Sequence, residues 1–162
     1  MEPEAHAAWA VAIEDSALGA FIRGSFVLYP IANLGHIFGL TFFVSAIVLL
    51  DLRLLGFGRG VALPAAARAL GPIALGALAL QLVSGATLFT ADAAHLWANP
   101  VMRIKATLIA LGLANAVAFR LLWQHRLEGW DAAPPALGRA QAAASLAGWI
   151  AVAACGRLIA YF

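Results

Sequence analysis

Two stretches of the 162-residue sequence lack Asp, Glu, Lys and Arg over lengths greater than the hydrocarbon core of a bilayer requires. The first runs from Gly24 to Leu50, and the second runs from Ala69 to Ala91. A helix needs about 20 apolar residues to cross that core, and lipid admits only backbone whose polar groups are paired internally. The sequence therefore predicts two transmembrane helices in its first two thirds.

Two shorter uncharged runs, Ala106 to Phe119 and Ala140 to Gly156, predict two further spans. Pro100 suits the first turn of the third span, and Arg103 and Lys105 can extend toward the membrane surface from within it. The composition agrees, since 64% of the residues are hydrophobic and 11% are charged. We expect an all-α bundle of four transmembrane helices, at about residues 30–52, 68–91, 101–123 and 137–161 within a membrane domain of residues 24–162.

The N-terminal segment has a different pattern. Between residues 5 and 22, helical spacing places one apolar stripe that avoids Glu14, Asp15 and Ser16. The stripe consists of Trp9, Ile13, Ala17, Ala20 and Phe21. This pattern predicts an amphipathic helix within residues 1–23 that lies on the membrane surface, with packing against a partner subunit as the alternative.

The charges at the helix ends predict the orientation. Six arginines fall in the first and third connections between spans: Arg53, Arg59, Arg68, Arg120, Arg126 and Arg139. Four basic residues fall on the opposite side: Arg23, Arg103, Lys105 and Arg157. The positive-inside rule favours a bacterial inner-membrane protein with both termini in the periplasm. Because no basic cluster occurs, nucleic acid is not an expected partner, and Asp51 and Arg53 are interpreted as a helix cap and a topology anchor.

His36 is the candidate functional residue, because ionisable groups inside a membrane are costly. Gly35 and Gly39 flank it and would leave helix surface bare for a flat ligand. If the helix begins at Pro30 rather than bending there, His36 lies close to the outer surface, and we expect this shallower placement.

The chemistry that fits His36 best is axial ligation of haem b, with electron transfer near the periplasmic face. His95, just after the second span, is the candidate for the second metal ligand; a five-coordinate iron and a haem shared by two chains are the alternatives. Arg103, Lys105 and Arg157 are the candidate partners of the haem propionates.

Other functions remain open at this point. His36 could instead belong to a polar seam with Asn33, Gln81, Ser84 or Asn115, or bind copper together with His95 and Cys155. The chain could also be a non-catalytic accessory subunit of a larger membrane complex, a homo-oligomer, or a small transporter that uses its basic residues as an anion site. The sequence contains no nucleotide-binding or hydrolase motif, so an enzyme is not the favoured interpretation.

Several motifs together resemble a family of small bacterial four-helix integral membrane proteins that is known as a domain of unknown function. The resemblance covers the chain from about Ser25 onward. The matching residues are Tyr29-Pro30, His36 with Gly39, Asp51-Leu-Arg-Leu-Leu-Gly56, Ser84-Gly85, Asn99-Pro100, Lys105, Asn115, and Gly156-Arg157 with Tyr161. The resemblance implies a four-helix membrane domain and no particular activity.

Overall fold

The computed structural model describes residues 7–161, which form seven α-helices and one 3₁₀ helix and contain no strand. Four helices are long and apolar enough to cross a membrane: α3 (Leu28–Leu55), α4 (Leu63–Ala91), α6 (Pro100–Trp123) and α7 (Ala136–Leu158), which η1 (Ile159–Tyr161) extends. Three are short: α1 (Ala8–Glu14), α2 (Ala17–Gly24) and α5 (Ala93–Ala98). The prediction of an all-α bundle with four spans is confirmed.

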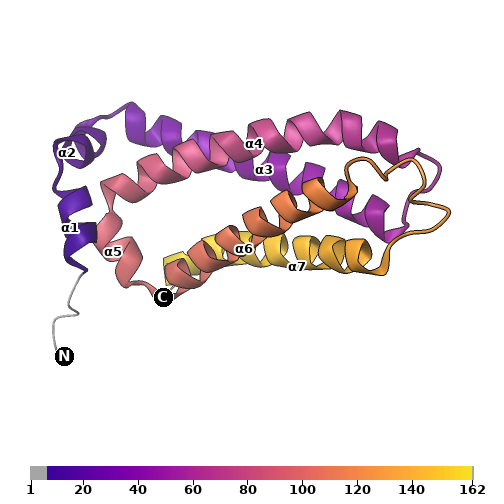
Figure 1. Cartoon of the computed structure of the whole chain (residues 1–162). Coiled ribbons are helices and arrows are strands. Elements are labelled where there is room, and N and C mark those ends of the chain that lie inside the picture. The colour runs from indigo at the N-terminus through magenta and orange to yellow at the C-terminus, as the bar shows by residue number, and fades with distance from the viewer. Residues whose placement is uncertain (1–6, 162) are drawn as a thin grey trace.

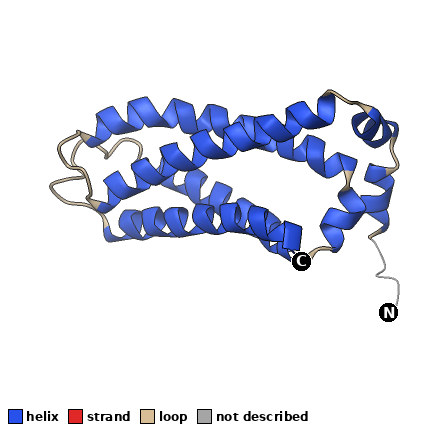
Figure 2. Ribbon diagram, turned by 180° about the vertical axis from the view of Figure 1, so that it is seen from behind, coloured by secondary structure: helices blue, strands red, loops and turns tan. Residues whose placement is uncertain are grey.

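The four long helices form two antiparallel hairpins, α3 with α4 and α6 with α7 (Figure 1). Helix α7 also packs on α3 and so joins the two hairpins. The three short helices lie together at one end of the bundle, here called the cap end, where η1 also lies (Figure 2). The connections 56–62 and 124–135 lie at the opposite end, here called the loop end. The first described helix and the last one therefore lie at the same end.

Helix α3 extends beyond the predicted span at both ends because its termini are satisfied locally. The Ser25 hydroxyl accepts a hydrogen bond from the backbone N–H of Leu28 at 3.0 Å, so the helix begins before Pro30, which stands unkinked in its first turn. At the other end Gly56 adopts φ 105°, and the N–H of Phe57 reaches the carbonyl of Leu52 at 3.0 Å. This is a Schellman motif, whose left-handed residue is favourable for glycine.

The predicted N-terminal helix is broken into two, which corrects the expectation of one continuous amphipathic helix. Helix α1 ends at Glu14, and the Ser16 hydroxyl caps α2 by accepting from the N–H of Gly19 at 3.1 Å. A serine side chain in this position accepts a backbone hydrogen bond that would otherwise be made within a continuous helix, and so it starts a new helix. Residues 1–6 of the predicted segment lie outside the described residues.

Contacts within the chain hold α1 and α2 at the cap end. The Glu14 carboxylate accepts from the first-turn N–H of Ala94 in α5 at 2.8 Å, and Arg23 donates to the carbonyl of Ala91 at 3.0 Å. Trp9 packs edge-on against Trp97 with ring centroids 4.9 Å apart. Helices α1 and α2 therefore pack on the end of α4 and on α5 and cover the cap end of the bundle.

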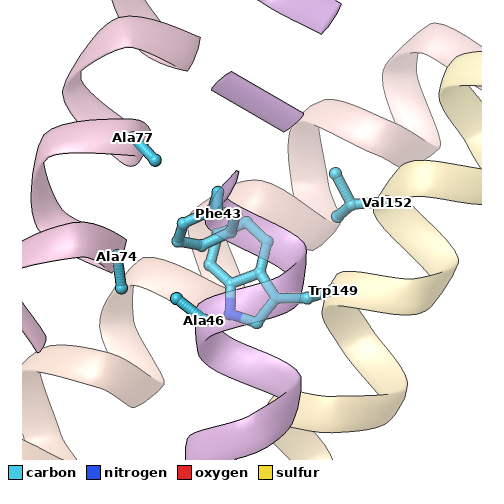
Figure 3. Packing of buried hydrophobic residues seen from close by; sticks show 6 residues of the cluster. All are labelled: Phe43, Ala46, Ala74, Ala77, Trp149 and Val152. Atoms are coloured by element: carbon cyan, nitrogen blue, oxygen red, sulfur yellow. The ribbon is translucent and has the colours of Figure 1, made fainter. Parts of the chain in front are cut away.

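The middle of the bundle is an apolar layer contributed by α3, α4 and α7 (Figure 3). Phe43 of α3 meets Trp149 of α7 edge to face, with centroids 4.6 Å apart and planes at 85°. Around this pair the core consists of small or branched side chains, namely Ala46, Ala74, Ala77 and Val152. Small residues let membrane helices approach closely, and this explains the tight α3–α4 contact.

A second buried cluster closes the loop end. It consists of Leu54, Leu63, Trp123, Trp130 and Ala142. The indole N–H of Trp130 donates to the carbonyl of Leu54 at 2.9 Å, which ties the 124–135 connection to the end of α3. Gly138 provides the space for this ring, since a Cβ there would lie 2.4 Å from Cη2 of Trp130.

Arg53 joins both connections of the loop end. Its guanidinium is bidentate to Asp131, at 2.8 Å and 2.5 Å, and its Nε donates to the carbonyl of Val61 at 2.7 Å. The Arg53 side chain is 5% exposed and the Asp131 side chain 43% exposed. The hydrogen bonds from Arg53 hold the pKa of Asp131 below its ordinary value of 3.8.

We expect Gly138→Ala to destabilise the bundle, because the added methyl would overlap the Trp130 ring. Overpacking of this kind costs about 1–3 kcal/mol, which thermal unfolding of the detergent-solubilised protein measures. Gly148→Ala is the matched control, since a Cβ there meets no atom within 4 Å. Equal effects of the two substitutions would contradict the packing described for Trp130.

The Arg53–Asp131 pair predicts a loss of stability in acid. Because the pKa of Asp131 is lower in the folded protein than in the unfolded one, the stabilisation is complete above the ordinary pKa and disappears as the pH falls through the lower, folded value. Thermal unfolding measured from about pH 7 to about pH 3 should show this acid-dependent loss of stability in the natural chain but not in Asp131→Asn. Asp15→Asn, which changes an exposed carboxylate with no ion pair among residues 7–161, should keep it.

Candidate functional site

His36 lies on α3 in the half of the bundle nearer the cap end. It follows the start of the helix by about 12 Å along the axis, somewhat farther than the predicted start at Pro30 would place it. Its imidazole is half-buried against α4, where Gly85 leaves room for it: a Cβ at Gly85 would lie 3.1 Å from Cε1 of the ring. The glycine at position 85 therefore lets the His36 ring pack directly on the backbone of α4.

The hydrogen bonds of Ser84 decide which nitrogen of His36 carries the proton. Nδ1 of His36 lies 3.0 Å from the Ser84 hydroxyl, and this hydroxyl lies 2.6 Å from the carbonyl of Leu80, to which it donates. A serine has a single hydroxyl proton, so Ser84 accepts from the ring and the proton of neutral His36 stands on Nδ1. Neutral His36 then carries its lone pair on Nε2, which is the protonation pattern that second-shell partners impose on metal-binding histidines.

Lys105 of α6 is the charged residue that acts electrostatically on His36. The same positive charge also interacts electrostatically with Cys155 of α7. Gly156 lies beneath it, with an ideal Cβ 3.5 Å from Nζ. The two hairpins therefore contribute His36 and Lys105, respectively, to one polar region inside the membrane.

Gln81 adds an unpartnered acceptor to the same region. Its Oε1 is buried and has no hydrogen-bond partner among the described residues. Gln81 lies one helical turn before Ser84, and its side chain contacts the position of Gly39, where a Cβ would lie 3.2 Å from Cγ. A buried amide oxygen without a donor costs free energy, so a ligand here would find an acceptor already desolvated.

The flanking glycines have a different role from the one predicted. Gly39 is buried against α4, with an ideal Cβ 3.3 Å from the carbonyl of Ala77, and Gly35 contacts Leu80. They permit close packing of α3 on α4 and do not leave bare surface beside His36. The expectation of exposed helix at Gly35 and Gly39 is therefore corrected, because the partner helix occupies that face.

The other predicted site residues are not gathered around His36. His95 is exposed on α5, which packs on α1, α4 and α6 and not on α3. Arg103 is exposed near the start of α6, and Arg157 stacks on Tyr161 at 4.7 Å and donates to its hydroxyl. All three lie toward the cap end, as predicted, but Lys105 alone among the predicted basic residues acts electrostatically on His36.

Asp51 and Arg53, interpreted from the sequence as a helix cap and a topology anchor, are both buried, and Gly56 is the C-cap of the helix. The two residues are 3% and 4% exposed, respectively. Arg53 is buried because its guanidinium bonds to both connections of the loop end, and Asp51 lies near Ser145 of α7. Sequence spacing suggested polar residues at a helix end, and it gave no signal that Asp131 would be the partner of Arg53.

Comparisons of this chain with protein-family models, with curated proteins and with solved structures find no match. Among residues 7–161, no three His, Cys, Asp or Glu side chains gather into a set that could hold a metal ion. The geometry thus gives no support to the predicted copper site of His36, His95 and Cys155. It leaves a chemistry in which a single histidine suffices.

We expect the Nδ1–H tautomer of His36 to depend on Ser84. In ¹⁵N-labelled protein, the two imidazole nitrogens should show a protonated Nδ1 and an unprotonated Nε2. Ser84→Ala removes the acceptor and should allow both tautomers, whereas Thr87→Ala, which removes a hydroxyl that bonds only within α4, should change nothing. A protonated Nε2 in the natural chain would contradict the assignment.

Proposed function

We propose that this chain is a membrane haem b protein in which His36 is an axial ligand of the iron. The observation that carries the proposal is the Ser84 hydroxyl, which fixes the His36 proton on Nδ1 and leaves Nε2 for a metal. A haem needs only one such histidine, whereas zinc and copper sites need further ligands that this region does not provide.

The surroundings of His36 suit an anionic planar ligand. Lys105 supplies a positive charge from α6, and Arg103 and Arg157 lie farther toward the same end, where propionates would emerge. The α3–α7 contact holds the hairpins together chiefly through the Phe43–Trp149 layer, deeper than His36. Lys105 would be an alternative to His95 as the second ligand, in which case its amine would bind in the neutral form and Arg103 and Arg157 alone would supply the positive charge.

When bound, haem supplies a one-electron redox centre. The chain's own residues then do three things. His36 would bind and orient the group, and Lys105 would provide positive charge that favours an added electron. The Phe43–Trp149 layer would keep water that enters from the loop end away from the haem. Electron exchange would therefore take place at the cap end.

The orientation in the membrane belongs to the same proposal. Arg59 and Arg126 lie in the two loop-end connections, and Arg53, Arg68, Arg120 and Arg139 lie in the helix ends beside them, so the positive-inside rule would place that end in the cytoplasm. The cap end, His36 and both termini would then face the periplasm of a bacterial inner membrane. A thiol-reactive or charged label on a cysteine introduced at Gly58, applied from either side, tests this orientation.

We expect protein produced with ample haem to show a Soret band and reduced α and β bands, and His36→Ala to abolish them. Ser84→Ala should weaken haem affinity roughly 10- to 100-fold, since it loses only the second-shell partner. His125→Ala, at the loop end, is the matched control and should retain full haem content. Reduced-minus-oxidised spectra and a pyridine haemochrome assay give the stoichiometry.

Two further variants decide the second ligand. Loss of the low-spin spectrum in Lys105→Met but not in His95→Ala would assign Lys105, and the reverse would assign His95. A colourless natural chain, or full haem content in His36→Ala, would reject the haem proposal and favour an accessory subunit of a larger membrane complex.

A further inference from the structure

The buried carboxyl of Asp51 is the one acidic group inside the described bundle that the proposed haem site leaves unexplained. It lies on α3 about 6 Å along the axis from the end of the helix at the loop end. Its exposure is 3%, and its Oδ2 is fully buried without a hydrogen-bond partner. Unpaired carboxylates are rarely found at such burial, because transfer from water costs many kcal/mol.

The neighbours of Asp51 offer no counter-charge. Arg53, on the same helix, directs its guanidinium to Asp131 and Val61. The nearest charged residues of the helices that pack on α3 are Arg68 on α4 and Arg139 on α7, and both are exposed. Ser145 of α7 is the polar side chain close to the carboxyl. A charge at this position would therefore be compensated by one hydroxyl alone.

The number of oxygen ligands distinguishes a proton from a metal cation. Hard cations are held by about six oxygens, and this site provides one carboxyl and one hydroxyl, with no further acidic group gathered near it among residues 7–161. A proton needs a single lone pair. It converts the carboxyl into a neutral acid whose O–H can donate and whose carbonyl oxygen can accept from Ser145.

We propose that Asp51 is an intramembrane proton-binding site that exchanges its proton with the loop end. It is separate from the His36 site, because the two residues lie about 22 Å apart along α3 and the Phe43–Trp149 layer stands between them. Asp51 lies about 6 Å along the axis from the loop-end terminus of α3, whereas the Phe43–Trp149 layer separates it from the cap end. The site is of the kind that membrane proteins use to take up a proton during their working cycle.

Infrared spectroscopy of the full chain in lipid nanodiscs tests this proposal without haem. At neutral pH the natural chain should show the carbonyl band of a protonated carboxylic acid, which should be lost in Asp51→Asn and retained in Asp15→Asn. Ser145→Ala should move the band to higher frequency, since the carbonyl oxygen loses a donor. In D₂O the band should shift down as the proton exchanges.

Labelling aspartate with ¹³C keeps the test decisive if Asp51→Asn fails to fold. The band should then move to lower frequency in the otherwise natural chain. Absence of the acid band at neutral pH, its persistence in Asp51→Asn, or its failure to move with ¹³C-aspartate would overturn the assignment to Asp51. A band that does not respond to D₂O would overturn the exchange with the loop end.

Discussion

The buried guanidinium of Arg53 is the interaction on which the loop end depends. A single side chain satisfies the carbonyl of Val61 in one connection and the carboxylate of Asp131 in the other. Because the charge is 5% exposed, its hydrogen bonds must all be made by the protein, and this fixes both connections relative to α3. The Trp130 indole, bonded to the carbonyl of Leu54, then closes the cluster over the same helix end.

Helix α3 carries three of the ionisable groups that lie inside the described bundle, and each of the three lies against a different element. His36 bonds to α4, Asp51 lies near Ser145 of α7, and Arg53 bonds to the connection between α6 and α7. In lipid a polar group without a partner costs more than in water, so these bonds specify the register of the surrounding helices. The same groups are the ones to which we assign chemistry.

The apolar layer around Phe43 and Trp149 separates the interior into two halves. The half toward the cap end holds His36, Gln81 and Lys105, and the half toward the loop end holds Asp51 and Arg53. Trp149 is the tryptophan of the middle layer, whereas Trp9 and Trp97 pack at the cap end, and Trp123 and Trp130 pack at the loop end. Gly112 of α6 lies beneath Trp149, which allows the second hairpin to close on this layer.

The sequence by itself determined the four spans and the place of Pro100 in the first turn of α6, because uncharged length and local helix-start signals act within a helix. It also named Ser84 among the possible partners of His36, although it could not choose between them. Only the tertiary structure decided that Gly39 packs on α4, that His95 points to solvent, and that Asp51 and Arg53 are buried. The reason is that helical periodicity specifies which residues share a face, whereas the partner of that face depends on how the two hairpins pack, and residues such as Arg53 and Asp131 meet only after that packing is complete.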